Sequence, residues 1–165
     1  MNPMLDERFR DELDRAGFAI VPDILPAEAV EKMAAAVECA IKKAGQSKHA
    51  MRHLLQAVPE VREAADDARV RRLVEPLLGL KAFVARSIFF DKTPDANWKV
   101  AWHQDLTIAV KEKIEVEGCT AWSVKDGIVH VQPPVSALER MATVRLHLDD
   151  CGLDNGPLQV IPRSH

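Results

Sequence analysis

The sequence contains no tyrosine, which excludes any mechanism that needs a phenol as acid, nucleophile or radical. It has no apolar run of about 18 residues that could span a bilayer, and its charged N-terminus lacks the pattern of a secretory signal. The three cysteines, Cys39, Cys119 and Cys151, fit neither a disulfide framework nor a Cys-x-x-Cys zinc site. We therefore expect a cytoplasmic protein with free, buried thiols, whose chemistry uses histidine, carboxylate or lysine side chains.

The sequence also lacks an excess of positive charge. Lysine and arginine total 22 against 25 aspartates and glutamates, which gives a formal net charge of -3. No broad positive field is available to hold nucleic acid or an anionic membrane, so we expect neither as a partner. The length of 165 residues and the hydrophobic content of 47% are typical of one globular domain with its own core.

Residues 1–80 are predicted to be the mainly helical part of this domain. Apolar residues recur at helical spacing before Gly17, and a second apolar stripe follows Pro26 and ends at two lysines, Lys42 and Lys43. Between these helices, the short apolar run Phe18–Leu25 could form a strand. One or two further helices are expected before Gly79, with breaks at the prolines at positions 59 and 76.

Residues 81–165 change to a β-type pattern. Tight turns are predicted at Asp126-Gly127 and at Asn155-Gly156-Pro157. Short strands separated by such turns indicate a β-sandwich or barrel, here with the helices buttressing one sheet. The predicted strands are Phe83–Phe90, Trp102–Val110, Thr120–Val124, Ile128–Val131, Met141–Leu148 and Leu158–Ile161.

The tripeptide His103-Gln104-Asp105 is the central chemical feature. Residues two apart in a strand point to the same side, so the imidazole and the carboxylate can converge on one cation. Non-haem iron(II) oxygenases use two histidines and one carboxylate on one face of an octahedron, which leaves three positions open. The spacing of His103 and Asp105 is therefore compatible with two ligands of such a site.

A second tripeptide, His147-Leu148-Asp149, has the same spacing and competes with the first. It lies in an alternating segment, where Leu146 and Leu148 form one face and His147 and Asp149 the other. That polar face could line a cavity or meet solvent. Residue types and spacing alone leave both tripeptides open as metal sites.

A series of motifs in order resembles the phytanoyl-CoA dioxygenase family, from about Phe9 to the end of the chain. The resemblance implies a double-stranded β-helix, which is a cupin-like jelly roll, within an α+β or mainly β domain. It also implies that His103 and Asp105 bind iron, whereas His147 and Asp149 are structural. The motifs are Arg86-Ser87-Ile88-Phe89-Phe90-Asp91-Lys92, Trp102-His103-Gln104-Asp105, Trp122, Val129-His130-Val131-Gln132-Pro133-Pro134, Arg145-Leu146-His147-Leu148-Asp149-Asp150 and Asn155-Gly156-Pro157-Leu158.

The resemblance further implies an Fe(II)- and 2-oxoglutarate-dependent dioxygenase, in which oxidative decarboxylation of 2-oxoglutarate accompanies substrate oxidation. Family relatives that halogenate lack the carboxylate ligand, so the presence of Asp105 implies hydroxylation of a small organic substrate. Trp122 and Lys92 are candidate contacts of 2-oxoglutarate, with core packing and a solvated turn as their alternatives. Gln104 and Thr107 could support the ligands by hydrogen bonds or point away from them.

The chain departs from the family pattern at its end. The second iron-binding histidine and the arginine that pairs with 2-oxoglutarate follow the Pro-x-Ser-His ending in the family, and this chain stops there, at His165. We therefore expect the C-terminal strands of the domain to be missing. Arg145 could replace the absent arginine, because a guanidinium matches a carboxylate, although a solvated strand arginine is the alternative.

Two other functions remain open from the sequence. The chain could be a catalytically incomplete homologue or fragment that binds a partner or forms a homo-oligomer through an open sheet edge. It could also be a cupin-type metal enzyme without a keto acid, but such sites usually gather more histidines. His49, His53 and His130 have no partner pattern, and we interpret them as surface or satisfied structural residues.

Overall fold

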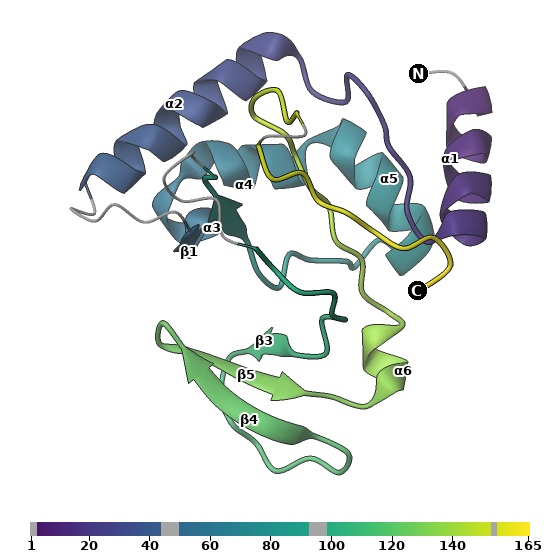
Figure 1. Cartoon of the computed structure of the whole chain (residues 1–165), viewed down its shortest axis with the longest axis vertical. Helices are drawn as coiled ribbons and strands as arrows, with labels where there is room; N and C mark the ends of the chain where they lie inside the picture. The colour runs from purple at the N-terminus through teal and green to yellow at the C-terminus, as the bar shows by residue number, and fades with distance from the viewer. Residues whose placement is uncertain (1–2, 44–49, 93–98, 153–154) are drawn as a thin grey trace.

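The computed structural model describes residues 3–43, 50–92, 99–152 and 155–165. Helices form one part of the molecule, and small antiparallel sheets lie beside and below them (Figure 1). In chain order the helices are α1 (Pro3–Ala16), α2 (Ala27–Lys43), α3 (Leu54–Ala57), α4 (Pro59–Asp66), α5 (Ala68–Leu78) and α6 (Val135–Leu138). The strands are β1 (Ala50–Arg52), β2 (Ile88–Phe90), β3 (Ile108–Val110), β4 (Thr120–Lys125) and β5 (Ile128–Gln132).

Helix α2 forms where the sequence predicts it and carries the main core. Pro26 precedes its first residue, and its carbonyl accepts from the N–H groups of Ala29 and Val30. Met33 and Val37, one helical turn apart, are buried, because residues at this spacing share one face. They pack with Leu54, Val58 and Ala64 into one cluster, which lies between α2 and the α3–α4 region.

The strands form two antiparallel sheets. Strands β1 and β2 make a two-stranded sheet, and the three-stranded sheet has the order β3-β5-β4. The β4–β5 hairpin turns at Asp126 and Gly127, whose φ angles of 51° and 77° are the left-handed values that a two-residue hairpin turn requires. The tight turn that the sequence predicted at Asp126-Gly127 is confirmed.

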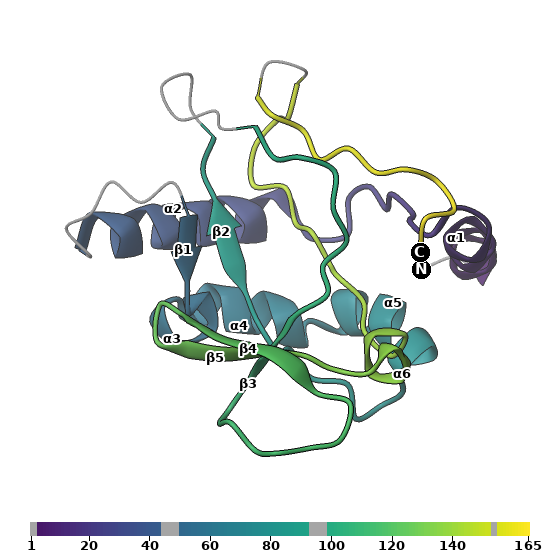
Figure 2. The ribbon, with the colours of Figure 1, turned by 60° about the horizontal axis from the view of Figure 1, so that its bottom comes forward.

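The tip of this hairpin is attached to the corner between β1 and α3. Arg52, at the end of β1, forms an ion pair with the Asp126 carboxylate, and His53 Nε2 lies 3.3 Å from the Asp126 carbonyl oxygen. The contact joins the two-stranded sheet to the three-stranded sheet. Figure 2 shows the hairpin and β1 meeting near α3.

Several predictions for the first half were wrong in detail. Residues 18–25 form no strand, and Asp23 there has a positive φ of 54°. The region before Gly79 contains three helices instead of one or two, because Pro59 begins α4 as a first-turn residue. Pro76 lies inside α5 without ending it. The cysteines are free, as expected, but Cys39 is exposed and the other two are half-buried.

The second half contains less strand than predicted. The predicted strands at residues 83–90 and 102–110 shorten to β2 and β3, and residues 141–148 and 158–161 belong to no strand. A strand needs a hydrogen-bonded neighbour as well as β-forming residues, and these segments have none among the described residues. The described part is a mixed helix and strand structure without a closed barrel. None of its helices is long and apolar enough to cross a membrane.

Asp67 caps the N-terminus of α5 and provides a test of local stability. Its carboxylate accepts two hydrogen bonds from the Arg69 side chain, at 2.8 and 2.6 Å, and one from the Arg69 backbone N–H, at 2.8 Å. These bonds favour the ionised form and lower the pKa of Asp67 from 3.8 to about 2. Because the pKa is lowered on folding, the stabilisation is present above pH 3.8 and is lost as the pH falls to about 2.

We expect Asp67→Ala to lower the free energy of unfolding by about 1 kcal/mol at neutral pH, the usual effect of losing an N-cap. The difference from the unsubstituted protein should shrink as the pH falls from 3.8 towards 2, because the wild-type carboxylate is then protonated. Urea unfolding across this pH range measures both effects. If the difference in unfolding free energy between the two proteins stayed constant with pH, the ionised Asp67 carboxylate would not be the source of the stabilisation.

Candidate metal centre

His103 and Asp105 lie close together, in an irregular segment that leads into β3. His103 Nε2 is 3.9 Å from Asp105 Oδ1, and the two side chains are 57% and 80% exposed. His103 Nδ1 lies 2.7 Å from the Ala101 carbonyl oxygen, which can only accept, so Nδ1 carries the hydrogen. This leaves the Nε2 lone pair available beside the carboxylate.

This arrangement can hold a divalent metal ion with little change. Two cis ligands of an octahedral ion, each about 2.1 Å from it, lie about 3 Å apart. The observed separation of 3.9 Å is slightly wider, and both groups are solvent-exposed, so a small side-chain rotation brings them to that distance. The hydrogen bond to Ala101 fixes the tautomer and the ring orientation, as is usual for metal-ligating histidines.

The competing tripeptide has a different environment. Leu146 and Leu148 pack against the core formed by α2, α3 and α4, so the intervening His147 and the following Asp149 are directed outward and exposed. Within the described structure no contact joins the side chains of these two residues, whereas the side chains of His103 and Asp105 approach each other to 3.9 Å. The alternation that the sequence predicted is therefore present at Leu146 and Leu148, and the assignment of the metal site to His103 and Asp105 stays a prediction.

The three predicted cofactor contacts lie on separate parts of the chain. Trp122 is half-buried on β4, with Lys113 Nζ 5.8 Å from the centre of its ring. Lys92 follows β2 and is half-buried, and Arg145 is exposed and forms no ion pair among the described residues. No described hydrogen bond or ion pair links Trp122 or Arg145 to His103 or Asp105. Their roles toward 2-oxoglutarate stay predictions.

A third metal ligand is not assembled in the described part of the chain. Its histidine, cysteine, aspartate and glutamate side chains gather no group of three that could hold a metal ion. His165 packs its ring against Gly17 at the end of α1. Gln104 Nε2 donates a hydrogen bond to the Ser164 carbonyl oxygen at 3.2 Å. Its side-chain amide therefore contacts the terminal segment and not the side chain of His103 or Asp105. His103 and Asp105 thus stay two candidate ligands, and the described residues supply no third ligand beside them.

His130 is a residue whose environment the sequence did not reveal. It is fully buried on β5, opposite Ala109 of β3 and Ser123 of β4. Its Nδ1 lies 2.9 Å from the Ile128 carbonyl oxygen, but its Nε2 has no hydrogen-bond partner in the described structure. The interpretation as a surface or satisfied residue was therefore wrong for His130. The neighbouring valines and the hairpin turn are the sequence signals that place it in the middle of a central strand.

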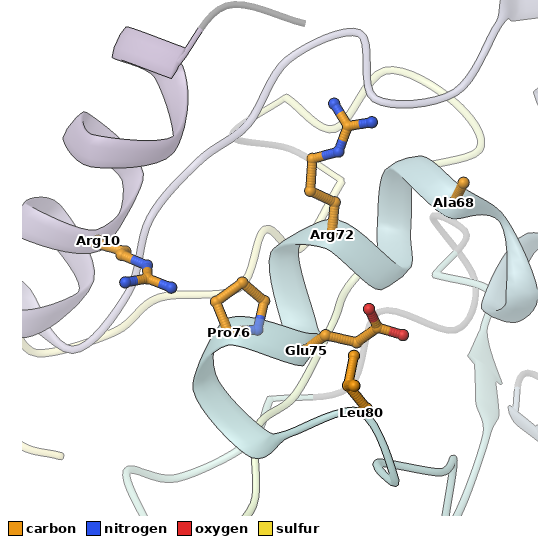
Figure 3. A pocket seen from close by; sticks show the side chains of 6 residues that line it. All are labelled: Arg10, Ala68, Arg72, Glu75, Pro76 and Leu80. Atoms are coloured by element: carbon orange, nitrogen blue, oxygen red, sulfur yellow. The ribbon is translucent and has the colours of Figure 1, made fainter.

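One pocket lies elsewhere, between α1 and α5 (Figure 3). It has a volume of about 390 Å³ and contains none of the predicted metal or cofactor residues. Glu75, which lines it, is paired with Arg71, whose guanidinium also donates to the carbonyls of Leu80 and Ala82. Glu75 is the only carboxylate among the lining residues, and no histidine or cysteine joins it, so the pocket lacks the donor set of a metal site. Its lining residues are Arg10, Ala68, Arg72, Glu75, Pro76 and Leu80.

Comparison with known proteins identifies the family. The sequence model of the phytanoyl-CoA dioxygenase (PhyH) family matches residues 13–165. Searches of curated proteins and of solved structures gave no significant match. The family match includes both His-x-Asp tripeptides and the terminal Pro-Arg-Ser-His sequence. Because it covers far more than half of the chain, the protein belongs to the phytanoyl-CoA dioxygenase family, a family of dioxygenase type.

Proposed function

We propose that the chain is an Fe(II)- and 2-oxoglutarate-dependent dioxygenase that hydroxylates a small organic molecule in the cytoplasm. The observation that carries the proposal is the pair formed by His103 and Asp105, with 3.9 Å between ligand atoms and the imidazole tautomer set by Ala101. Membership of the family supports the same chemistry. The proposal includes a jelly-roll domain, of which the antiparallel sheet β3-β5-β4 would be one part.

Within this proposal, the chain's own residues have defined tasks. His103 and Asp105 would hold the metal ion on one side and leave its other positions open, where 2-oxoglutarate would bind and supply the oxidising equivalents. The guanidinium of Arg145 is a candidate partner for a 2-oxoglutarate carboxylate, because it has no ion pair among the described residues. Trp122 and Lys92 are proposed as further contacts of the cosubstrate.

An anaerobic titration with Fe(II) and 2-oxoglutarate tests the metal site and the cosubstrate together. We expect a saturable visible charge-transfer band, because the keto acid chelates the metal ion in the open positions. His103→Ala should abolish the band, whereas His147→Ala, which removes the exposed histidine of the other tripeptide, should leave it unchanged. Absence of the band in the unsubstituted protein would count against the proposed function.

A second candidate function, a binding or dimerising module, is favoured by the amount of exposed surface. The chain exposes 12346 Å², whereas a compact monomer of 18.3 kDa exposes roughly 8000 Å². Strands β3 and β4 are both edges of their sheet, with β5 as their only partner among the described strands. Sedimentation equilibrium distinguishes the two functions, because a strict monomer would argue against association through these edges.

A further inference from the structure

The terminal segment 161–165 lies beside the candidate metal tripeptide, although some 60 residues separate them in sequence. Gln104, between the two candidate ligands, donates a hydrogen bond from Nε2 to the Ser164 carbonyl oxygen at 3.2 Å. Ser164 in turn donates from Oγ to the Ile161 carbonyl oxygen at 2.7 Å, which closes a tight turn. One side-chain hydrogen bond therefore joins the tripeptide to an ordered turn.

The same segment is held on its other side by the end of α1. The Arg163 N–H donates to the Ala16 carbonyl oxygen at 2.9 Å. The His165 ring occupies the space next to Gly17, where an added Cβ would come within 2.7 Å of the ring carbon Cγ. Gly17 has a φ of 83°, which favours glycine and ends the helix at this point. Both figures show the chain end beside the C-terminal end of α1 (Figures 1 and 2).

The tripeptide needs such support because no strand holds it. Residues 99–107 lie outside every described strand, so no backbone ladder fixes the orientation of His103 or Asp105. His103 and Asp105 flank Gln104 directly in sequence, and their side chains approach each other to 3.9 Å. A contact that holds Gln104 in place therefore restrains the backbone from which both side chains extend.

We propose that Gln104 is a positioning residue, which anchors the metal tripeptide to the terminal segment 161–165 and through it to α1. The proposal rests on the function proposed above, because it assigns His103 and Asp105 as metal ligands. Supporting residues that orient metal ligands typically change metal affinity by about 10–100-fold when they are replaced. Gln104 makes no bond to a ligand atom itself. It restrains the backbone between the two ligand residues, and this restraint orients their side chains.

The test compares Gln104→Met with the unsubstituted chain, because methionine keeps the length of the side chain but removes the donor. Mn(II) affinity is measured by calorimetric titration, and hydrogen exchange of the segment 161–165 is measured without metal. We expect Mn(II) to bind about 10–100-fold more weakly, and the Arg163 amide to exchange faster. Gln56→Met, at an exposed glutamine of α3, is the matched control and should change neither quantity.

The two measurements separate the possible failures. Unchanged exchange at residues 161–165 in Gln104→Met would overturn the proposal, whether or not metal binds. Faster exchange with an unchanged Mn(II) affinity would also overturn it, because Gln104 would then hold the segment without positioning the ligands. If the unsubstituted chain bound no Mn(II), the proposed function and this role of Gln104 would fail together, and the exchange data would still decide whether the hydrogen bond anchors the segment.

Discussion

Asp105→Gly is expected to abolish hydroxylation and to weaken metal binding by more than about 100-fold. Replacing a supporting residue costs about 10–100-fold in affinity, and removing a ligand atom should cost more. Under the proposed function, His103 and Asp105 are the two ligands among the described residues, so losing the carboxylate leaves His103 alone. Mn(II) titration and the formation of succinate from 2-oxoglutarate measure the two effects.

Asp149→Gly is the matched control for this experiment. Asp149 is also an exposed aspartate two residues after a histidine, so the substitution makes the same chemical change and has a similar effect on backbone entropy. It should leave metal affinity and succinate formation unchanged. Undiminished product from Asp105→Gly would remove Asp105 from the site, and equal losses in both variants would indicate a general loss of folding.

Leu54→Ala is expected to lower the free energy of unfolding by about 2–5 kcal/mol. Leu54 is 4% exposed at the start of α3 and packs with Met33, Val37, Val58 and Ala64, so truncation leaves a cavity that helices on several sides cannot easily close. For a chain of this size, each 1 kcal/mol corresponds to a decrease of about 2–4 °C in the melting temperature. Thermal and urea unfolding check the value.

Leu80→Ala provides the comparison for the core substitution. Leu80 is 80% exposed, so the same truncation there should change stability by no more than about 0.5 kcal/mol. Similar losses at the two positions would show that the cluster around Leu54 is not the main core. The predicted difference depends on burial alone, because the two variants remove the same atoms.

Local sequence patterns predicted the elements that depend on nearby residues. The periodic apolar stripe predicted α2, because residues one turn apart share a face, and Met33 and Val37 are indeed buried. The Asp126-Gly127 pair predicted the β4–β5 hairpin, because both positions require a left-handed backbone. Failures occurred where β-forming residues needed a distant partner, as in the unpaired segment 141–148.

The order of motifs along the chain also predicted the family, which the match over residues 13–165 confirms. A single His-x-Asp tripeptide would not have been enough, since the sequence contains two. Several weak signals in a fixed order are far less frequent by chance than any one of them. The sequence by itself therefore determined the family, the two long N-terminal helices, the hairpin and a choice between two candidate ligand pairs.

Only the tertiary structure showed how the surroundings of the two pairs differ. Leu146 and Leu148 pack against the helical core, which directs His147 and Asp149 to solvent, whereas His103 and Asp105 approach each other. The structure also decided that Gln104 contacts Ser164 and that His130 is buried without a partner for Nε2 among the described residues. These facts depend on contacts between residues far apart in sequence, and local residue preferences carry no information about which distant surfaces will meet.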